Sequence, residues 1–192
     1  MRSVATFAYP CCLLLGSLWL VARRKDDCMT DQKPITTQIN GRVGILRFNR
    51  PQVMNAFDTA LIEATNQAMH DFMADDAVLA IIICGHGRCF SAGFDMKESA
   101  DRGIRGQAEW RKVLTKDFDF IMQFWHAPKP TIAAAHGYCI GGAMELLMAC
   151  DLSVASETTL FGEPEVRFGS GIVAMLAPYV IGPKQAKELL LT

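Results

Sequence analysis

Short apolar runs alternate with longer helical stretches along most of this chain, and that alternation limits the folds available to it. Residues 78–84 read VLAIIIC, a continuous apolar run with three isoleucines that is typical of a strand covered on both faces. Residues 131–135 and 151–155 predict further short strands. The expected helices span residues 59–73, 107–125, 142–150, 172–181 and 184–191. Strands that alternate with helices in this way predict an α/β fold with parallel strand pairing.

The start of this pattern carries turn and capping signals. Ile35–Ile39 and Val43–Phe48 read as a strand pair, and Asn40-Gly41 supplies the turn between them. Asp58 is placed to cap the first helix. The apolar face of that helix consists of Leu61, Thr65, Ala68, Met69 and Phe72. The sequence therefore predicts a hairpin followed by an amphipathic helix.

Composition removes several classes of protein from consideration. The chain has 192 residues, of which 51% are hydrophobic and 20% are charged, so disorder, a collagen helix and a coiled coil are excluded. Lysine and arginine number 19 against 20 acidic residues, which gives a net charge of −1. A nucleic-acid partner is not expected, because neutralising phosphates requires a surplus of basic residues.

The first 28 residues are treated as an apolar leader, separate from a core at residues 29–192. Residues 4–22 carry no charge, and Arg23-Arg24-Lys25 follows them. One interpretation is a membrane anchor, since about 20 apolar residues span a bilayer. The interpretation we favour is upstream sequence that does not belong to the native chain, which then begins at Met29. In both cases we expect the core to lie in the cytoplasm.

Seven cysteines occur at irregular spacing, which favours reduced, mostly buried thiols over a disulfide framework. One cluster, Cys84-Gly85-His86-Gly87-Arg88-Cys89, contains metal-ligand side chains. It lacks a second pair of ligands, and structural zinc sites usually close with four. We therefore expect no metal ion, and no separate cofactor either.

Glu145 is the first candidate for chemistry. It is the only charged residue between Gly137 and Cys150, in a helix that is apolar nearly all round. An ionised carboxylate in such surroundings costs several kcal/mol unless it is paired or its pKa rises. The structural alternative is a capping box, but that motif needs Ser or Thr at the cap, where this chain has Gly141-Gly142. A functional role is the favoured interpretation.

Two loops are candidates for binding an oxygen atom that carries negative charge. Gly141-Gly142 lies where a strand enters the Glu145 helix, and the free N–H groups at a helix start bind anions. Residues 89–95, CFSAGFD, follow a buried strand and end at Asp95, which could cap a short helix. The N–H of Phe94 would point out of this tight turn. If the two N–H groups converge, they form an oxyanion hole.

A third element, Phe161-Gly162-Glu163-Pro164-Glu165, places two glutamates around a proline in an apolar neighbourhood. One glutamate could be a solvated loop charge and the other a catalytic acid. The residues alone do not decide between Glu163 and Glu165.

Together these segments resemble the enoyl-CoA hydratase/isomerase (crotonase) superfamily. The resemblance covers nearly all of residues 35–192. Its motifs are Leu46–Pro51 with Asn55-Ala56, Cys89–Glu98, His136–Leu146 with Ala149–Asp151, Phe161–Glu165, and Gly182–Thr192. These motifs, in the right order, are specific for the superfamily and less so for any one reaction.

The resemblance implies a ββα spiral core and an acyl-CoA thioester as substrate. By motif position, the backbone N–H groups of Phe94 and Gly142 become the oxyanion hole. Glu145 and Glu165 become the catalytic pair of a hydratase, which adds water to a 2-enoyl-CoA as in fatty-acid β-oxidation. The further residues that the resemblance places at the substrate are Ala92, Gly93, Asp95, Lys97 and Gly141.

Residues 169–175 read GSGIVAM, where many family hydratases have a Gly-rich stretch, so other crotonase reactions stay open. These are double-bond isomerisation and thioester hydrolysis. A non-catalytic homologue that acts through subunit association is the alternative from another class. The last helix reaches Thr192 without a cap, so we expect a missing C-terminal helical segment. The family implies a homotrimer or hexamer for the complete protein.

Overall fold

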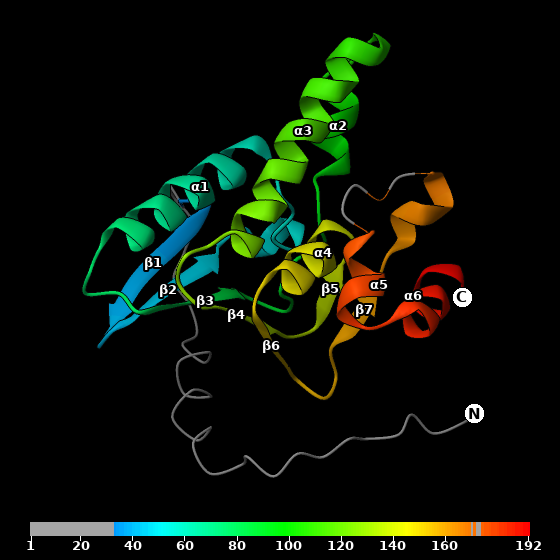
Figure 1. Cartoon of the computed structure of the whole chain (residues 1–192). Coiled ribbons are helices and arrows are strands. Elements are labelled where there is room, and N and C mark those ends of the chain that lie inside the picture. Colours follow the sequence, from blue (N-terminus) through cyan, green and yellow to red (C-terminus); the bar gives the residue numbers. More distant parts are fainter. Residues whose placement is uncertain (1–32, 170, 172–173) are drawn as a thin grey trace. The chain divides into compact units, whose positions relative to one another are not determined.

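The structure is a computed structural model that describes residues 33–169, 171 and 174–192. The expected leader, residues 1–28, lies outside the described residues, and so does part of the helix expected at 172–181. Figure 1 shows the elements in chain order. The strands are β1 (Ile35–Asn40), β2 (Val43–Phe48), β3 (Ala80–Gly85), β4 (Thr131–Ala135), β5 (Tyr138–Ile140), β6 (Leu152–Ala155) and β7 (Leu160–Gly162). The α-helices are α1 (Thr59–Ala74), α2 (Met96–Asp101), α3 (Gly106–Trp125), α4 (Gly142–Ala149), α5 (Leu176–Val180) and α6 (Pro183–Leu191).

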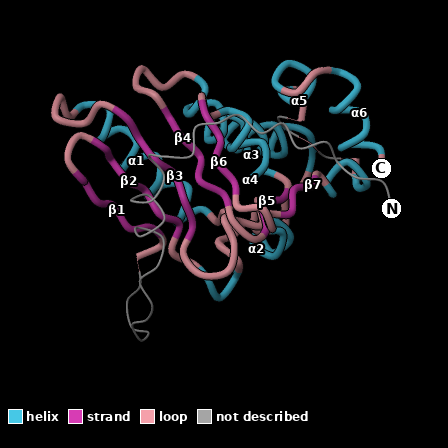
Figure 2. The backbone as a smooth tube through the Cα atoms, turned by 90° about the horizontal axis from the view of Figure 1, so that it is seen from below, coloured by secondary structure: helices cyan, strands magenta, loops and turns pink. Residues whose placement is uncertain are grey.

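The larger sheet has five strands in the order β1-β2-β3-β4-β6 (Figure 2). Only β1 and β2 pair antiparallel, as a hairpin, and the remaining neighbours are parallel. Parallel neighbours need a crossover, which helices and loops provide here. β5 and β7 form a separate parallel pair. The α/β class predicted from the sequence is therefore confirmed, with one antiparallel hairpin at its edge.

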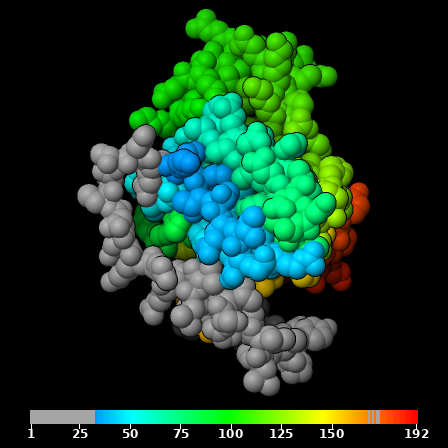
Figure 3. All heavy atoms as spheres, turned by 90° about the vertical axis from the view of Figure 1, so that its left-hand side faces the viewer, coloured from blue at the N-terminus to red at the C-terminus, as the bar shows by residue number. Residues whose placement is uncertain are grey.

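Helix α1 follows its sequence pattern closely. The Asp58 side chain accepts a hydrogen bond from the Leu61 N–H at 2.8 Å, which caps the first turn. The five buried residues of α1 are the five that the periodicity predicts. This face covers β1 and β2, and Figure 3 shows α1 beside that hairpin.

The expectation that the strand at residues 78–84 is covered on both faces is wrong for the described residues. Ile81 and Ile83 of β3 are fully buried, whereas Ala80 and Ile82 between them are half-buried. β6 is exposed along its whole length. The reason is that α1 and α4 lie on the same face of the five strands in Figure 2. One face therefore holds the core, and β2, whose residues Gly44–Phe48 are all buried, is the strand covered on both faces.

Aromatic rings fill the core between this sheet face and α3. Phe57 packs edge-on against Phe48 at 5.2 Å between ring centroids and against Phe120 at 5.2 Å. It also meets Phe94 at 5.8 Å. Edge-to-face pairs of this kind are a favourable arrangement of aromatic rings. The core therefore anchors the ring of Phe94, whose backbone N–H is one of the candidate oxyanion-hole donors.

Candidate active site

The loop that carries Phe94 runs alongside β5. Ser91 forms a parallel bridge with Cys139, in which the Ser91 N–H donates to the Tyr138 carbonyl at 3.2 Å. The Ile140 N–H returns a bond to the Ser91 carbonyl at 3.3 Å. Since β5 leads straight into α4, this pairing delivers the end of the loop to the start of the helix.

Gly93 makes the close approach of the two segments sterically feasible. Its φ is +83°, and a Cβ added there would lie 2.7 Å from the Ile140 carbonyl oxygen and 3.0 Å from the Gly142 nitrogen. Both the backbone conformation and the lack of space favour glycine. The Phe94 ring, in turn, lies on Gly142, where an added Cβ would be 2.5 Å from Cε2 of the ring.

The direction of the Phe94 N–H follows from its neighbours. The Phe57 N–H donates to the Gly93 carbonyl at 2.8 Å, and the Asp95 N–H donates to the Phe57 carbonyl at 3.0 Å. Backbone groups alternate in direction along an extended segment. The Phe94 N–H therefore points away from Phe57. The segment that carries this donor lies next to the start of α4, and its role in an oxyanion hole stays a prediction.

The N–H of Gly142 opens α4, and the Glu165 carboxyl group lies beside it. Gly141 caps the helix with φ +58° and ψ −131°. A Cβ added at Gly93 would lie 3.0 Å from the Gly142 nitrogen and 3.5 Å from a Glu165 carboxyl oxygen, and the Gly142 N–H acts to lower the pKa of this carboxyl group. A Cβ on Gly141 would overlap that carboxylate. A carboxyl group thus lies where the sequence predicts an anion-binding donor, and the role of that donor stays a prediction.

Three glutamates gather at this point. Glu145 of α4 is 2% exposed and Glu163, which precedes the 3-10 helix Pro164–Phe168, is 5% exposed. Glu165 is half-buried in that 3-10 helix. Neither Glu163 nor Glu165 is a solvated loop charge, so burial does not single out one of the two as the catalytic acid.

The electrostatics of the three carboxyl groups are dominated by burial. Burial, and then the charges of Glu145 and Glu165, raise the pKa of Glu163 from 4.5 to about 9. Burial also raises the pKa of Glu165, against the opposing effect of hydrogen bonds from its own N–H and that of Gly142. Near neutral pH, Glu163 is therefore a neutral carboxylic acid beside the expected catalytic pair.

Of the other residues expected at the substrate, Gly93 and Gly141 lie beside the Glu165 carboxyl group at the start of α4. Ala92 is half-buried, and its N–H donates to the Met54 carbonyl at 3.0 Å. Asp95 accepts from the N–H groups of Lys97 and Glu98, both at 3.2 Å, and so caps α2. Lys97 is exposed on that helix. The structure gives Asp95 a local structural contact, and the substrate contacts of these residues stay predictions.

Sequence reasoning named Asn55 only as part of a motif, but the structure gives it a central place. Asn55 is fully buried with φ +54°. Its side-chain amide donates to the carbonyl oxygens of His86, Cys89 and Phe90 at 2.9, 3.0 and 3.1 Å. Its oxygen accepts from the Arg50 N–H at 2.9 Å. One side chain therefore holds the start of the loop that carries Phe94.

Arg50 ties the same loop to α1 and α2. Its guanidinium lies 2.9 Å from the Asp58 carboxylate and 3.4 Å from that of Asp95. These two aspartates cap α1 and α2 respectively. Only an arginine has donors spread widely enough to serve both caps and a backbone carbonyl, that of Ala56, at once. The signal available in the sequence was the short run from Arg50 to Asp58.

Among the residues that the structure describes, no group of three or more His, Cys, Asp or Glu is arranged to hold a metal ion. The thiols of Cys84, Cys89, Cys139 and Cys150 are free. Burial raises the pKa of Cys84 to about 11 and that of Cys150 to about 12, so these two are inert, protonated side chains. Within the same described ranges, no helix is both long and apolar enough to cross a membrane.

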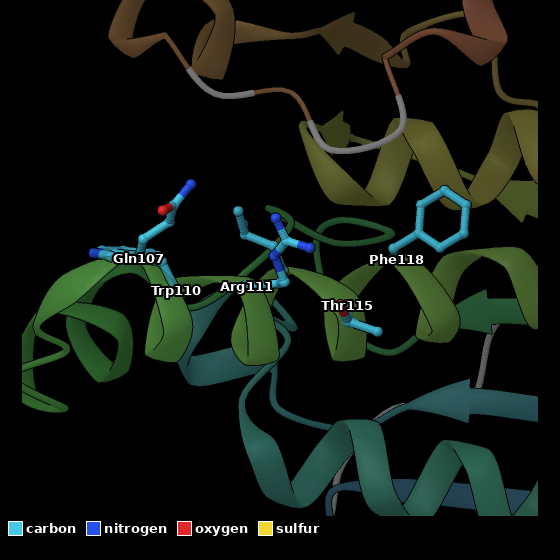
Figure 4. A pocket seen from close by; sticks show the side chains of 6 residues that line it. Gln107, Trp110, Arg111, Thr115 and Phe118 are labelled. Carbon is cyan, nitrogen blue, oxygen red and sulfur yellow. The ribbon is translucent and has the colours of Figure 1, made fainter.

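A separate hollow of about 410 Å³ lies along α3 (Figure 4). Trp110, Leu114 and Phe118 follow one another at four-residue spacing on its floor and are 44%, 39% and 43% exposed. The remaining lining residues are Gln107, Arg111 and Thr115. The hollow is mainly apolar and does not include the three glutamates.

Known proteins resemble this chain in sequence. The profile of the family described as "Enoyl-CoA hydratase/isomerase" matches residues 38–192. A protein of Dictyostelium discoideum named "Probable enoyl-CoA hydratase, mitochondrial" is 38% identical over 82% of this chain and 56% of its own length. "Enoyl-CoA hydratase, mitochondrial" of Pongo abelii is 38% identical over 68% of this chain and 43% of its own. The chain thus spans about half the length of these curated relatives.

Solved structures share the fold. The crystal structure of an enoyl-CoA hydratase/isomerase from Xanthobacter autotrophicus Py2 superposes with a TM-score of 0.79 at 47% identity, over 82% of this chain and 59% of that one. One from Marinobacter aquaeolei gives 0.76 at 27% identity, over 82% and 62%. Together with the family match over residues 38–192, this likeness confirms the crotonase-type fold. The chain belongs to the enoyl-CoA hydratase/isomerase family.

Proposed function

We propose that this protein adds water across the double bond of a 2-enoyl-CoA thioester. The observation that carries the proposal is the convergence of the Gly142 N–H, the Phe94 loop and the carboxyl groups of Glu145 and Glu165. Water addition requires a base for the water, an acid for the α-carbon and a charge-stabilising site for the thioester oxygen. In this chain, the two glutamates are the candidate base and acid, and the backbone N–H groups are the candidate charge-stabilising site.

The thioester oxygen gains negative charge as water attacks the β-carbon. In the proposed complex it takes the place beside the Gly142 N–H where the Glu165 carboxyl group lies in the structure. The Phe94 N–H is the second donor. Each donor of such a hole contributes about 3 kcal/mol in enzymes where one has been removed.

Glu145 and Glu165 lie on different elements, α4 and the 3-10 helix Pro164–Phe168, so they can approach one water molecule from two sides. One carboxylate accepts a proton from the water whose hydroxyl joins the β-carbon. The other, as a carboxylic acid, gives its proton to the α-carbon. A 1,3-proton shift needs only one carboxylate that acts as base and then as acid, so the pair favours hydration.

The acyl chain of the substrate needs an apolar surface. α3 packs against α4, the helix of Glu145, and it exposes the ridge formed by Trp110, Leu114 and Phe118. We assign this ridge to the acyl chain. No cofactor is proposed, because coenzyme A is part of the substrate.

The reaction is that of the hydration step of fatty-acid β-oxidation, and we propose that the complete protein works as a homotrimer or hexamer. A cytoplasmic location stays a prediction. Two of the relatives above carry "mitochondrial" in their names, so the compartment needs its own measurement.

The test follows hydration of a short 2-enoyl-CoA as loss of the absorbance of the conjugated thioester. Glu145→Gln and Glu165→Gln keep shape but remove the titrating proton. Each should lower kcat by at least about 10²-fold, and the double variant should lose little more. Glu157→Gln, which alters an exposed glutamate of the β6–β7 connection, is the matched control.

Other outcomes identify the alternatives. Turnover of a 3-enoyl-CoA alone would replace hydration by double-bond isomerisation, and release of free coenzyme A thiol would indicate thioester hydrolysis. Binding of acyl-CoA without any turnover would point to a non-catalytic homologue. Near-full hydration by Glu165→Gln would contradict the two-carboxylate mechanism.

A further inference from the structure

Glu163 is a buried carboxyl group that the proposed hydration mechanism does not use. It is 5% exposed, and its two carboxyl oxygens accept no hydrogen bond from a donor in the described residues. A buried polar group left in this state costs free energy, so it calls for an explanation. A bare carboxylate has no donor of its own, whereas a protonated carboxyl has one O–H to give.

The groups that act on Glu163 come from three elements. The charges of Glu145, on α4, and of Glu165, in the 3-10 helix Pro164–Phe168, both raise the pKa of Glu163 after burial, and a hydrogen bond between the Glu163 and Glu145 side chains raises it further. From β5, the Cys139 thiol lies close enough for Glu163 to raise its pKa in turn. All these neighbours are neutral or anionic, so they oppose a second charge on Glu163.

We propose that Glu163 is a positioning residue which keeps its proton and donates it as an O–H hydrogen bond to the carboxylate of Glu145. The Glu145 carboxylate is 2% exposed in an otherwise apolar helix. Such a charge needs a donor to remain ionised and to keep one orientation. This inference deepens the proposed hydratase function, because an ionised, oriented Glu145 is the form that accepts a proton from water.

The proposal predicts the ranking of two substitutions. Glu163→Gln has a side chain of the same length that ends in an N–H donor and is neutral at every pH. Glu163→Met keeps the approximate volume but has no donor. Glu163→Met should therefore lower kcat at least about tenfold, the effect of losing a hydrogen bond to a charged group. Glu163→Gln should recover most of that loss.

The pH profile separates positioning from packing. Wild-type kcat should fall as the pH rises through about 9, where Glu163 ionises, loses its O–H and sets a second negative charge beside Glu145. Glu163→Gln should lack this alkaline limb. An unchanged limb in Glu163→Gln, or full activity in Glu163→Met, would overturn the proposal.

A measurement without substrate makes this result independent of the proposed activity. In protein labelled with ¹³C at the glutamate carboxyl carbons, one resonance should titrate with a midpoint of about 9. It should be absent from Glu163→Gln, unchanged in Glu157→Gln and shifted to lower pH in Glu145→Gln, where the negative neighbour is gone.

The two failures can be told apart. If the wild-type protein does not hydrate a 2-enoyl-CoA but this resonance behaves as described, the proposed function is wrong and the Glu163–Glu145 pair stands. If hydration is observed but Glu163 titrates near 4.5, or does not respond to Glu145→Gln, the pair is wrong and the hydratase stands.

Discussion

The side-chain amide of Asn55 donates to the Phe90 carbonyl oxygen at 3.1 Å, and so joins the end of one loop to the start of another. The same nitrogen serves two further carbonyl oxygens in the loop that leads to Phe94. Asn55→Ala leaves these buried acceptors unpaired and places alanine at φ +54°. We expect the free energy of unfolding to fall by about 2–4 kcal/mol, measured by urea denaturation.

Two further variants separate the causes. Asn55→Gly relieves the backbone conformation, so the loss that remains in it measures the hydrogen bonds alone. Asn66→Ala removes an exposed asparagine of α1 that accepts one hydrogen bond, from Gln123 at 2.6 Å, and should change stability by no more than about 1 kcal/mol. Equal stability of Asn55→Ala and wild type would show that water replaces the side chain.

Gly141 offers a prediction with a closely matched control. A Cβ at Gly141 would overlap the Glu165 carboxylate, whereas one at Gly103 would meet nothing within 4 Å. Both glycines have φ +58°. Alanine strains the backbone at both positions, by about 1 kcal/mol in the left-handed helical region and by up to about 3 kcal/mol at Gly141, where ψ is −131°. Only Gly141→Ala should also displace Glu165, and we expect its kcat for hydration to fall at least about 10²-fold.

Steady-state kinetics and thermal melting check this comparison. Gly103→Ala should lower the melting temperature by a few degrees and leave kcat unchanged. A similar kcat for the two variants would mean that the Glu165 carboxylate does not need the space beside Gly141.

The pKa of Glu163 also makes stability depend on pH. Its value of about 9 in the folded protein lies above its ordinary value of 4.5, so between these values the folded state holds a proton that the unfolded chain has lost. The free energy of unfolding should fall as pH rises through this window, by at most about 1.4 kcal/mol per pH unit. Urea denaturation at a series of pH values measures the slope.

Glu163→Gln removes that proton uptake, so its stability relative to wild type should rise with pH across the same window. Glu157→Gln should run parallel to wild type. Parallel curves for Glu163→Gln and wild type would show that Glu163 ionises normally in the folded protein.

Self-association is expected through β6. This strand pairs only with β4 among the described strands, and its Leu152 and Val154 are 61% and 49% exposed. An exposed apolar edge is a template for pairing with another chain. We expect ill-defined oligomers of the 192-residue chain in sedimentation velocity experiments, reduced by Leu152→Lys or Val154→Lys. A monodisperse monomer would contradict this expectation.

The sequence predicted the regular elements because local patterns determine them. The buried face of α1, its Asp58 cap and the hairpin turn at Asn40-Gly41 depend on residues a few positions apart, and the structure has all of them. The strands β5 and β7 were not predicted. Each has three residues, too few for any periodicity, and they form because the chain brings them side by side.

The candidate site shows the same division. The two turns that carry the candidate donors, the N–H groups of Phe94 and Gly142, could be predicted from the sequence, because each turn depends on a neighbouring glycine. The pairing of Glu163 with Glu145 could not, because 18 residues separate them and only the folded chain buries both. Asn55 was missed for a similar reason, since its acceptors lie more than 30 residues further along the chain.

The Glu165 carboxyl group lies beside the Gly142 N–H, so it competes with a substrate oxygen for this donor. A substrate oxygen can bind this donor only in the fraction of molecules whose carboxylate has moved aside, so the apparent dissociation constant exceeds the intrinsic one by the reciprocal of that fraction. Protonation of Glu165 weakens its hold on the donor and enlarges the open fraction. Occupancy by substrate and the charge on Glu165 are therefore thermodynamically linked, and each shifts the other by the same factor.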